Sequence, residues 1–211
     1  MNEYHKIQTV FLRNPDSNYK NLLLGKWSKP EFDLLKNIDW VWTEKIDGTN
    51  IRIMWDGESV KFGGRTDNAQ IRASLLEVLQ NKFTVDNMSE VFKEQTEVCL
   101  YGEGYGKGIH KGGNYLPESV NFILFDIKIE QWWLTRDSIE EIAEMLGVEI
   151  VPIIGLGTLD QVVKLAKQGF TSRIAENKQF MAEGLIMKPQ QELFNRGGKR
   201  VITKIKYKDF C

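Results

Sequence analysis

The segment Glu44-Lys45-Ile46-Asp47-Gly48-Thr49-Asn50 brings together residue types that can support covalent catalysis. Its lysine stands at the end of an expected strand, beside acidic residues and a glycine. An amine attacks only in its neutral form, and the ordinary lysine pKa of about 10.4 leaves few neutral amines at pH 7. Positive neighbours or burial must therefore lower the pKa of a nucleophilic lysine. The segment predicts a nucleophile provided that the fold supplies such neighbours.

A basic cluster near the C-terminal end is the candidate source of those neighbours. Positions 188 to 208 hold seven basic residues and a single acid, Glu192. Lys204 and Lys206 stand two apart on an expected strand and so share one face, while Lys188 comes from a second strand. The cluster suits an anion such as a triphosphate or a nucleic-acid backbone. The alternative is a solvated edge strand that lysines protect from aggregation.

The composition of the whole chain is that of an ordinary globular protein. The chain has 211 residues, of which 42% are hydrophobic and 27% charged, and its 28 basic and 29 acidic residues give a net charge of -1. No global field therefore marks a nucleic-acid coat or membrane-surface protein. Two cysteines exclude a cysteine zinc site and suit a reducing compartment, and two histidines exclude an H-E-x-x-H metalloprotease. Neither a secretory signal nor a spanning apolar run appears, which predicts a cytoplasmic protein.

The elements that must position these residues predict one α+β domain over residues 1–211. Apolar alternation predicts a strand at 40–44 and a hairpin of strands 51–55 and 59–65 about the turn Asp56-Gly57. The further expected elements are helices at 70–82, near 91–92, at 137–146 with an Asp137/Glu140 capping box, and at 158–168, and strands at 97–105, 121–129, 183–188 and 200–206. This order does not alternate as a parallel βαβ fold does.

The glycine-rich stretch from Tyr101 to Gly108 matches neither common phosphate-binding pattern. Its spacing is one residue short of a Walker loop, and the dinucleotide pattern G-x-G-x-x-G is absent. Glycine favours tight turns, so the stretch by itself predicts a β-turn within a glycine-rich loop from Gly102 to Gly113.

Six short motifs nevertheless follow one another along the chain. They are Lys45-Ile46-Asp47-Gly48, Gly64-Arg65-Thr66, Gly102-Glu103-Gly104, Phe125-Asp126-Ile127, Glu183-Gly184-Leu185-Ile186-Met187-Lys188 and Lys204-Ile205-Lys206. The series resembles the covalent nucleotidyltransferase superfamily, which holds polynucleotide ligases and mRNA capping enzymes. Thr49-Asn50 and Gly64-Arg65-Thr66 are similar to the RNA ligase 2 branch of phage and trypanosome-editing ligases. DNA ligases usually have arginine where Asn50 stands, which favours RNA.

The resemblance implies a fold of two mainly antiparallel sheets flanked by helices, and an ATP-dependent reaction with a divalent metal, Mg or Mn. RNA 5'-phosphate and 3'-hydroxyl ends would be joined through a lysyl-AMP and an adenylated RNA end. By this resemblance Lys45 attacks the α-phosphate, and Lys204 and Lys206 contact that phosphate and help to keep the nucleophile neutral. Glu183 binds the metal directly or through water, which suits magnesium.

The resemblance also assigns the remaining site residues. Phe125 stacks on the adenine or is a core aromatic, and Glu103 accepts hydrogen bonds from the ribose. Glu44 receives the adenine amino group, and Arg65 holds a phosphate or the RNA 3' end. The less specific expectations are Asn50 and Thr49 at the ribose or in the turn, Asp47 shaping the turn, Lys188 near the phosphates, and Asp126 as a second metal carboxylate or a buried structural acid.

Several alternatives stay open at the level of sequence. A DNA nick ligase or a capping guanylyltransferase shares the superfamily motifs, and a non-catalytic nucleotide- or RNA-binding module could retain the fold. The intact Lys45, Glu183, Lys204 and Lys206 argue against that module. The chain ends five residues after Lys206, so no C-terminal accessory domain is expected. The chain is then either a minimal ligase or a truncated chain that acts with an accessory protein. The expected substrates are nicked or single-stranded RNA ends, and no membrane partner is expected. The expected location is the cytoplasm or, if the protein is phage-encoded, the host cytoplasm.

Overall fold

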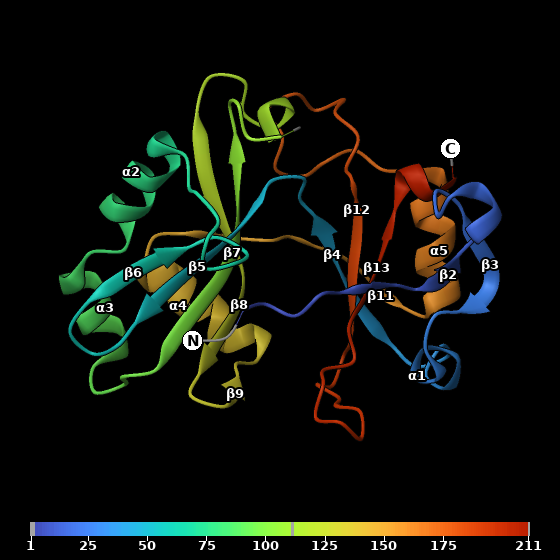
Figure 1. Ribbon diagram of the computed structural model, residues 1–211, viewed down its shortest axis with the longest axis horizontal. Helices are drawn as coiled ribbons and strands as arrows, with labels where there is room; N and C mark the ends of the chain where they lie inside the picture. The colour runs from blue at the N-terminus through green and yellow to red at the C-terminus, as the bar shows by residue number, and fades with distance from the viewer. Residues whose placement is uncertain (1–2, 111, 211) are drawn as a thin grey trace. The chain divides into compact units, whose positions relative to one another are not determined.

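A computed structural model describes residues 3–110 and 112–210. The chain forms two compact units, each built on its own sheet, and Figure 1 labels their elements. Unit 1 comprises the described residues of Met1–His5, Asp47–Val151 and Ala175–Asn177. Unit 2 comprises those of Lys6–Ile46, Pro152–Ile174 and Lys178–Cys211.

Unit 1 contains a six-stranded sheet in the order β10-β8-β7-β5-β6, with β9 paired to β8. Its strands are β5 (Thr49–Trp55), β6 (Val60–Gly63), β7 (Val98–Gly106), β8 (Val120–Ile129), β9 (Trp132–Trp133) and β10 (Glu149–Ile150). Every pairing is antiparallel except that of β10 with β8. Its helices are α2 (Ala73–Lys82), α3 (Val85–Phe92) and α4 (Arg136–Met145), with the 3-10 turn η2 (Gly112–Asn114). The predicted hairpin about Asp56-Gly57 is confirmed as β5 and β6.

The core of unit 1 lies on one face of this sheet. Ile51, Ile53 and Trp55 alternate along β5 and are almost fully buried, because successive side chains of a strand point to opposite faces. Leu75 and Leu79 of α2 join the same core. The opposite face carries Asn50, Arg52 and Met54 of β5, with Glu103 and Tyr101 of β7 opposite the first two.

The predicted glycine-rich turn and loop begin later than expected, because β7 continues to Gly106 and the turn lies at Lys107 and Gly108. A Cβ on Gly102 would lie 2.2 Å from the ring of Phe122. A Cβ on Gly104 would lie 2.3 Å from a methyl group of Leu75. These glycines thus allow close packing within a strand and do not mark a turn.

Unit 2 contains a five-stranded sheet in the order β1-β13-β12-β4-β11, and a two-stranded β2–β3 ribbon. Its strands are β1 (Gln8–Thr9), β2 (Phe11–Arg13), β3 (Leu22–Trp27), β4 (Trp40–Lys45), β11 (Ile153–Gly157), β12 (Gly184–Pro189) and β13 (Thr203–Lys206). Its helical segments are η1 (Pro15–Ser17), α1 (Pro30–Leu34), α5 (Leu159–Gln168) and η3 (Tyr207–Phe210). Among the described residues of unit 2, only β1 and β13 pair in parallel. The predicted mainly antiparallel α+β fold is confirmed.

Helix α5 follows its sequence signals. Thr158 and Gln161 form a reciprocal capping box, and Leu159, Val162 and Ala166 face the core of unit 2. Helix α4 differs from the prediction, because Thr135 caps it by accepting the N–H of Ser138. The predicted Asp137/Glu140 box is therefore wrong, since the helix begins one residue before Asp137.

No helix within residues 3–110 and 112–210 combines the length and the apolar character that a membrane crossing requires.

Candidate active site

Three lysines lie on one face of the five-stranded sheet. Gly184 on β12 is directly opposite Lys45 on β4 and Lys206 on β13. Two residues further along β12, Ile186 is opposite Lys204. Residues paired across strands, and residues two apart along a strand, share a face. The register therefore brings together Lys45, Lys204 and Lys206, as the sequence predicted for the last two.

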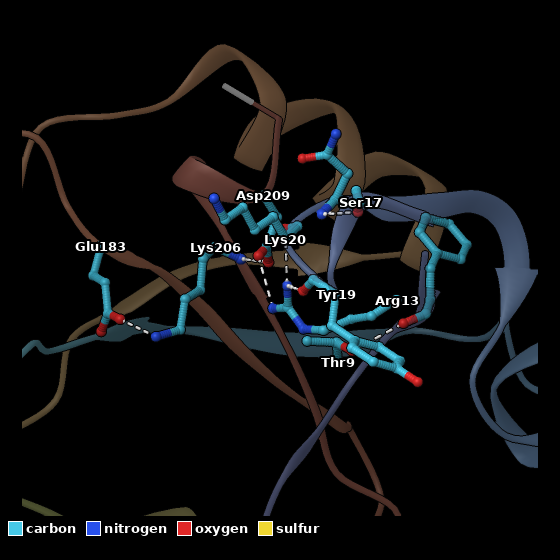
Figure 2. Close-up of polar contacts among 10 residues, drawn as sticks. Thr9, Arg13, Ser17, Tyr19, Lys20, Glu183, Lys206 and Asp209 are labelled. Atoms are coloured by element: carbon cyan, nitrogen blue, oxygen red, sulfur yellow. Dashed lines mark hydrogen bonds and ion pairs between the residues drawn. The ribbon is translucent and has the colours of Figure 1, made fainter. Parts of the chain in front are cut away.

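Glu183 joins two of these lysines. Its Oε2 accepts a hydrogen bond from Lys45 Nζ at 2.5 Å, and its Oε1 accepts one from Lys206 Nζ. Figure 2 shows the Lys206 contact. Gly184, which follows Glu183, has no side chain to separate Lys45 from Lys206. One carboxylate is thus held between two ammonium groups beside a third, Lys204.

The charges of this cluster shift its titration. Burial alone raises the pKa of Glu183, but Lys45 and Lys206 more than offset burial and hold that pKa below its ordinary value. Burial is also the main cause that lowers the pKa of Lys204 to about 8, and the charges of Lys45 and Lys206 add to it. The cluster therefore keeps a full carboxylate and one readily neutralised lysine.

Glu44 does not point to this face. It is opposite Leu185 on β12, a core residue, and is only 1% exposed. Its Oε2 accepts the backbone N–H of Arg173 at 2.9 Å, and the Ser172 side chain also bonds to it. Burial is the main cause that raises the pKa of Glu44, and these two hydrogen bonds oppose the rise. Its Oε1 is buried without a hydrogen-bond partner. The predicted contact between Glu44 and the adenine amino group stays a prediction.

Lys188 continues the lysine-bearing face of β12. It is opposite Val41 on β4, two residues beyond Ile186. The pairing of β12 with β13 ends earlier, at Met187 and Thr203. Lys188 is therefore on the predicted face but beyond the end of β13.

In unit 1, Asn50 and Glu103 are direct neighbours. Asn50 on β5 is opposite Glu103 on β7, on the face away from the core. The Oδ1 atom of Asn50 is buried without a hydrogen-bond partner. Two predicted ribose-contacting residues are thus adjacent, and one of them retains an unused acceptor, which is rare in a buried side chain.

A β-bulge sets the direction of Phe125. Tyr101 pairs with Asp126, while the next residue, Gly102, pairs with Leu124, so Phe125 is the extra residue of β8. The ring of Tyr4 packs edge-on against Phe125 and tilted against Tyr101, each at 5.1 Å between centroids. Phe125 is half-buried and outside the apolar core of unit 1. The bulge therefore keeps this aromatic ring off the core.

Asp126 is fully buried. Its Oδ2 accepts a hydrogen bond from the Tyr4 hydroxyl at 2.5 Å. This environment favours the structural alternative that the sequence left open, and the role of Asp126 at a metal stays a prediction. Tyr4 itself was not predicted, because a single tyrosine near the start of a chain carries no pattern.

The turn after Lys45 requires a glycine. A Cβ on Gly48 would lie 2.2 Å from the carbonyl oxygen of Gly104. The backbone N–H of Asp47 donates to the Tyr115 hydroxyl at 3.3 Å. These contacts fix the beginning of β5 against β7, which supports the predicted turn-shaping role of this segment.

Arg65 is exposed, on a loop that a buried arginine anchors. Arg52 is 0% exposed, and its Nε donates to the Gly64 carbonyl at 2.8 Å. Its Nη2 donates to Asp67 at 2.7 Å. The two contacts flank Arg65 and so fix the loop that presents it. This role was not predicted, since Arg52 occupies an ordinary polar position of an alternating strand.

The donor set limits how a metal can be held. Within residues 3–110 and 112–210, no group of three or more His, Cys, Asp or Glu side chains is arranged to hold a metal. Magnesium often binds through one or two protein carboxylates while keeping several waters. Glu183 fits that pattern as a single carboxylate on the lysine-bearing face.

Comparison with known proteins identifies the family. Residues 38–206 match the profile of the family described as RNA ligase. The fold is similar to a Naegleria gruberi RNA ligase variant with ATP and Mn, at a TM-score of 0.65 and 20% identity, over 84% of this chain and 52% of that chain. A variant with AMP and Mn gives a TM-score of 0.66 and 18% identity, over 98% and 58%.

The same ligase with PPi gives a TM-score of 0.66 and 19% identity, over 98% of this chain and 58% of that chain. This chain thus spans little more than half the length of the Naegleria chains it matches, and at such identities the likeness shows a shared fold. The profile covers well over half of this chain, which confirms the resemblance seen in the six motifs: the protein belongs to the RNA ligase family.

Proposed function

We propose that this protein is an ATP-dependent RNA ligase that joins a 5'-phosphate to a 3'-hydroxyl through a lysyl-AMP. The observation that carries the proposal is the cluster of Lys45, Lys204 and Lys206 on one sheet face, with the carboxylate of Glu183 between two of them. Three ammonium groups and one carboxylate leave an excess of positive charge, which suits a triphosphate.

Lys45 is the nucleophile in the first step. Its Nζ must leave the ion pair with Glu183 and lose a proton before its lone pair can attack the α-phosphorus of ATP. A nitrogen–phosphorus bond forms, the bond from the α-phosphorus to the bridging oxygen breaks, and pyrophosphate leaves with those electrons. Lys204 and Lys206 stabilise the charge on the α-phosphate oxygens, where fixed positive groups are most effective.

Residues of unit 1 bind the nucleoside. Phe125 stacks on the adenine, which its half-buried position outside the core permits. Asn50 and Glu103 contact the ribose, and the unused buried acceptor of Asn50 supports this assignment. Glu44 accepts the adenine amino group at Oε1, which is buried without a hydrogen-bond partner while Oε2 accepts the Arg173 N–H.

A divalent cation, Mg or Mn, belongs to the proposal. When bound, such an ion neutralises phosphate charge and helps pyrophosphate to leave. Glu183 is the residue that would hold it. The burial of Asp126 and its bond from Tyr4 support a structural role for that acid more than metal binding.

The later steps use RNA. The AMP moves from Lys45 to the RNA 5'-phosphate, and the RNA 3'-hydroxyl then attacks that phosphate with release of AMP. Arg65 suits an RNA phosphate or the 3' end, because its guanidinium binds oxygens in pairs and its loop is anchored by Arg52. Lys188 adds positive charge for the nucleic-acid backbone.

We infer that residues 1–211 form one nucleotidyltransferase domain, and that an accessory protein supplies further RNA-binding surface. The protein acts in a reducing compartment such as the cytoplasm, which suits Cys99 because this residue is a buried free thiol. If the protein is phage-encoded, that compartment is the cytoplasm of the host.

The test is a sealing assay with purified protein, ATP or GTP, and magnesium. RNA with one 5'-phosphate and one 3'-hydroxyl is compared with DNA and with RNA–DNA nicks. ATP-dependent sealing of RNA supports the proposal. Preferential sealing of nicked DNA favours a DNA ligase, and a covalent GMP adduct favours a capping guanylyltransferase. Binding without any reaction, by protein shown to be folded, favours a non-catalytic module.

A further inference from the structure

Asp209 is a buried acid that none of the roles above uses. It lies in η3, immediately after β13, and its side chain is 1% exposed. Its Oδ2 accepts the backbone N–H of Lys206 at 2.9 Å, and its Oδ1 accepts Nη2 of Arg13 at 2.8 Å. Figure 2 shows both contacts. One carboxylate therefore connects a site lysine to the N-terminal part of unit 2.

The strand pairing shows why Lys206 requires this acceptor. The N–H of Tyr207 donates to the Glu183 carbonyl at 3.0 Å, on the side of β12. Because backbone groups alternate in direction along a strand, the N–H of Lys206 points to the side of β1. The pairing of β1 with β13 ends at Lys204. Asp209 supplies the acceptor that the short strand β1 does not reach.

Arg13 makes Asp209 part of a larger anchor. Its Nη1 donates to the carbonyls of Tyr19 and Lys20, each at 3.1 Å, and its Nη2 binds Asp209. Figure 2 shows the guanidinium between these groups. A guanidinium is planar and presents its donors in fixed directions. The Tyr19–Lys20 turn thus limits where the Asp209 carboxylate can lie.

The same N-terminal segment also holds Lys204. The N–H of Val10 donates to the Lys204 carbonyl at 3.0 Å, and Thr203 Oγ1 donates to the Gln8 carbonyl at 3.0 Å. The backbone of β13 is therefore fixed on this side at Lys204 by β1 and at Lys206 by Asp209. Both lysines of the motif are held by the segment from Gln8 to Lys20.

We propose that Asp209, held by Arg13, is a positioning residue that sets the place of Lys206 beside Glu183 and Lys45. This inference rests on the proposed function, because its consequence is measured in the transfer of AMP to Lys45. Asp209 touches neither nucleotide nor RNA and acts through the backbone of Lys206. A displacement of about 1 Å in such a group reduces a rate by about a hundredfold.

The test compares Asp209→Ala, Asp209→Asn and Arg13→Ala in the full chain. The rate of covalent AMP formation is measured at several ATP concentrations, and urea unfolding gives the folded fraction. Asp209→Ala is expected to slow adenylation of folded protein at saturating ATP by about tenfold to a hundredfold. Asp209→Asn, whose amide oxygen still accepts the Lys206 N–H, is expected to recover most of that rate. Arg13→Ala is expected to show an intermediate loss.

Glu192→Ala is the matched control. It removes another ion pair of unit 2, in which Glu192 binds buried Arg200 at 2.7 Å, and it is expected to lower stability without slowing the folded protein. A folded Asp209→Ala protein that adenylates at the wild-type rate overturns the inference. The inference is also overturned if Asp209→Ala and Glu192→Ala, compared at the same folded fraction, lose adenylation rate equally. Wild-type protein that forms no adduct overturns the proposed function, and the inference with it.

Discussion

Lys45 and Lys206 donate to the two oxygens of one carboxylate, that of Glu183, from strands on either side of it. The cluster is therefore formed by strand register before any ligand binds. A carboxylate in this position offsets the repulsion between two ammonium groups. A polyanion that enters must compete with Glu183 for both lysines.

Replacing Glu183 by Gln tests this role in stability. Without the carboxylate, three lysines remain on one sheet face, and the free energy of unfolding is expected to fall by about 3–5 kcal/mol. The loss should shrink at high salt, because screening weakens the repulsion. Urea unfolding at low and high ionic strength measures both effects. Asp33→Asn, which removes an exposed pair with Lys36 in the same unit, should change stability by less than about 0.5 kcal/mol. Equal losses in the two variants would contradict the account.

Lys204 is expected to lower the free energy of unfolding, because its ammonium group is half-buried next to two other lysines. Its pKa is lowered to about 8, first by burial, so between pH 8 and about 10 the unfolded state binds more protons and wild-type stability rises with pH. Below pH 8 both states carry the proton, and the full destabilisation remains. Lys204→Met is therefore expected to unfold at higher urea than wild type at pH 7, with the difference disappearing above about pH 10.

The same Lys204→Met protein should form AMP adduct at least about tenfold more slowly, because a fixed positive charge at the phosphate is lost. A variant less stable than wild type at pH 7 would contradict the destabilisation attributed to Lys204, and unchanged adenylation would contradict its role at the phosphate.

Phe125 should contribute to nucleotide binding more than to folding. Stacking of a base on an aromatic ring contributes about 1–3 kcal/mol, so Phe125→Ala is expected to weaken ATP binding by roughly tenfold to a hundredfold. Calorimetric titration measures the affinity. Phe122→Ala is the matched control, since Phe122 is 0% exposed in the core of unit 1 and its loss should destabilise the fold. Unchanged ATP affinity in Phe125→Ala would contradict the stacking and indicate that Phe125 is structural.

Gly48→Ala tests the turn that follows Lys45. A Cβ there would lie 2.2 Å from the Gly104 carbonyl oxygen, so β5 and β7 would have to separate. Adenylation is expected to fall by about a hundredfold, since displacement of the turn moves the segment next to the nucleophile. Gly197→Ala, where the nearest atom would be at 3.4 Å, should behave as wild type. Normal adenylation by Gly48→Ala would refute the requirement for close approach.

Strand periodicity carried most of the prediction of the fold. The hairpin of β5 and β6, helix α5 and the strand that bears Lys45 follow from apolar spacing and turn residues. The glycines of β7 favoured a turn, because glycine permits either a turn or close packing and only the partners Phe122 and Leu75 distinguish the two. The strands β1 to β3 were not predicted: β1 and β2 have only two and three residues, and the six residues of β3 do not alternate between buried and exposed.

The candidate site was predictable where residues follow a motif, and not where they act through distant partners. The shared face of Lys204 and Lys206 follows from their spacing. Their contact with Glu183 depends on the order β13-β12-β4, which no local pattern encodes. Asp209 depends on Arg13, at the other end of the chain. The opposite directions of Glu44 and Lys45 follow from alternation, but which of them faces the core depends on packing against Leu185.

The most direct measurement is the identification of the residue that carries AMP. Purified protein is first shown by intact mass to be free of adduct, and is then incubated with magnesium and α-labelled ATP. Denaturing electrophoresis and peptide mass mapping follow, with Lys45→Ala beside the wild type. The account predicts one AMP on Lys45 in the wild type and none in folded Lys45→Ala. An adduct that persists in Lys45→Ala, or no adduct in the wild type, would contradict it.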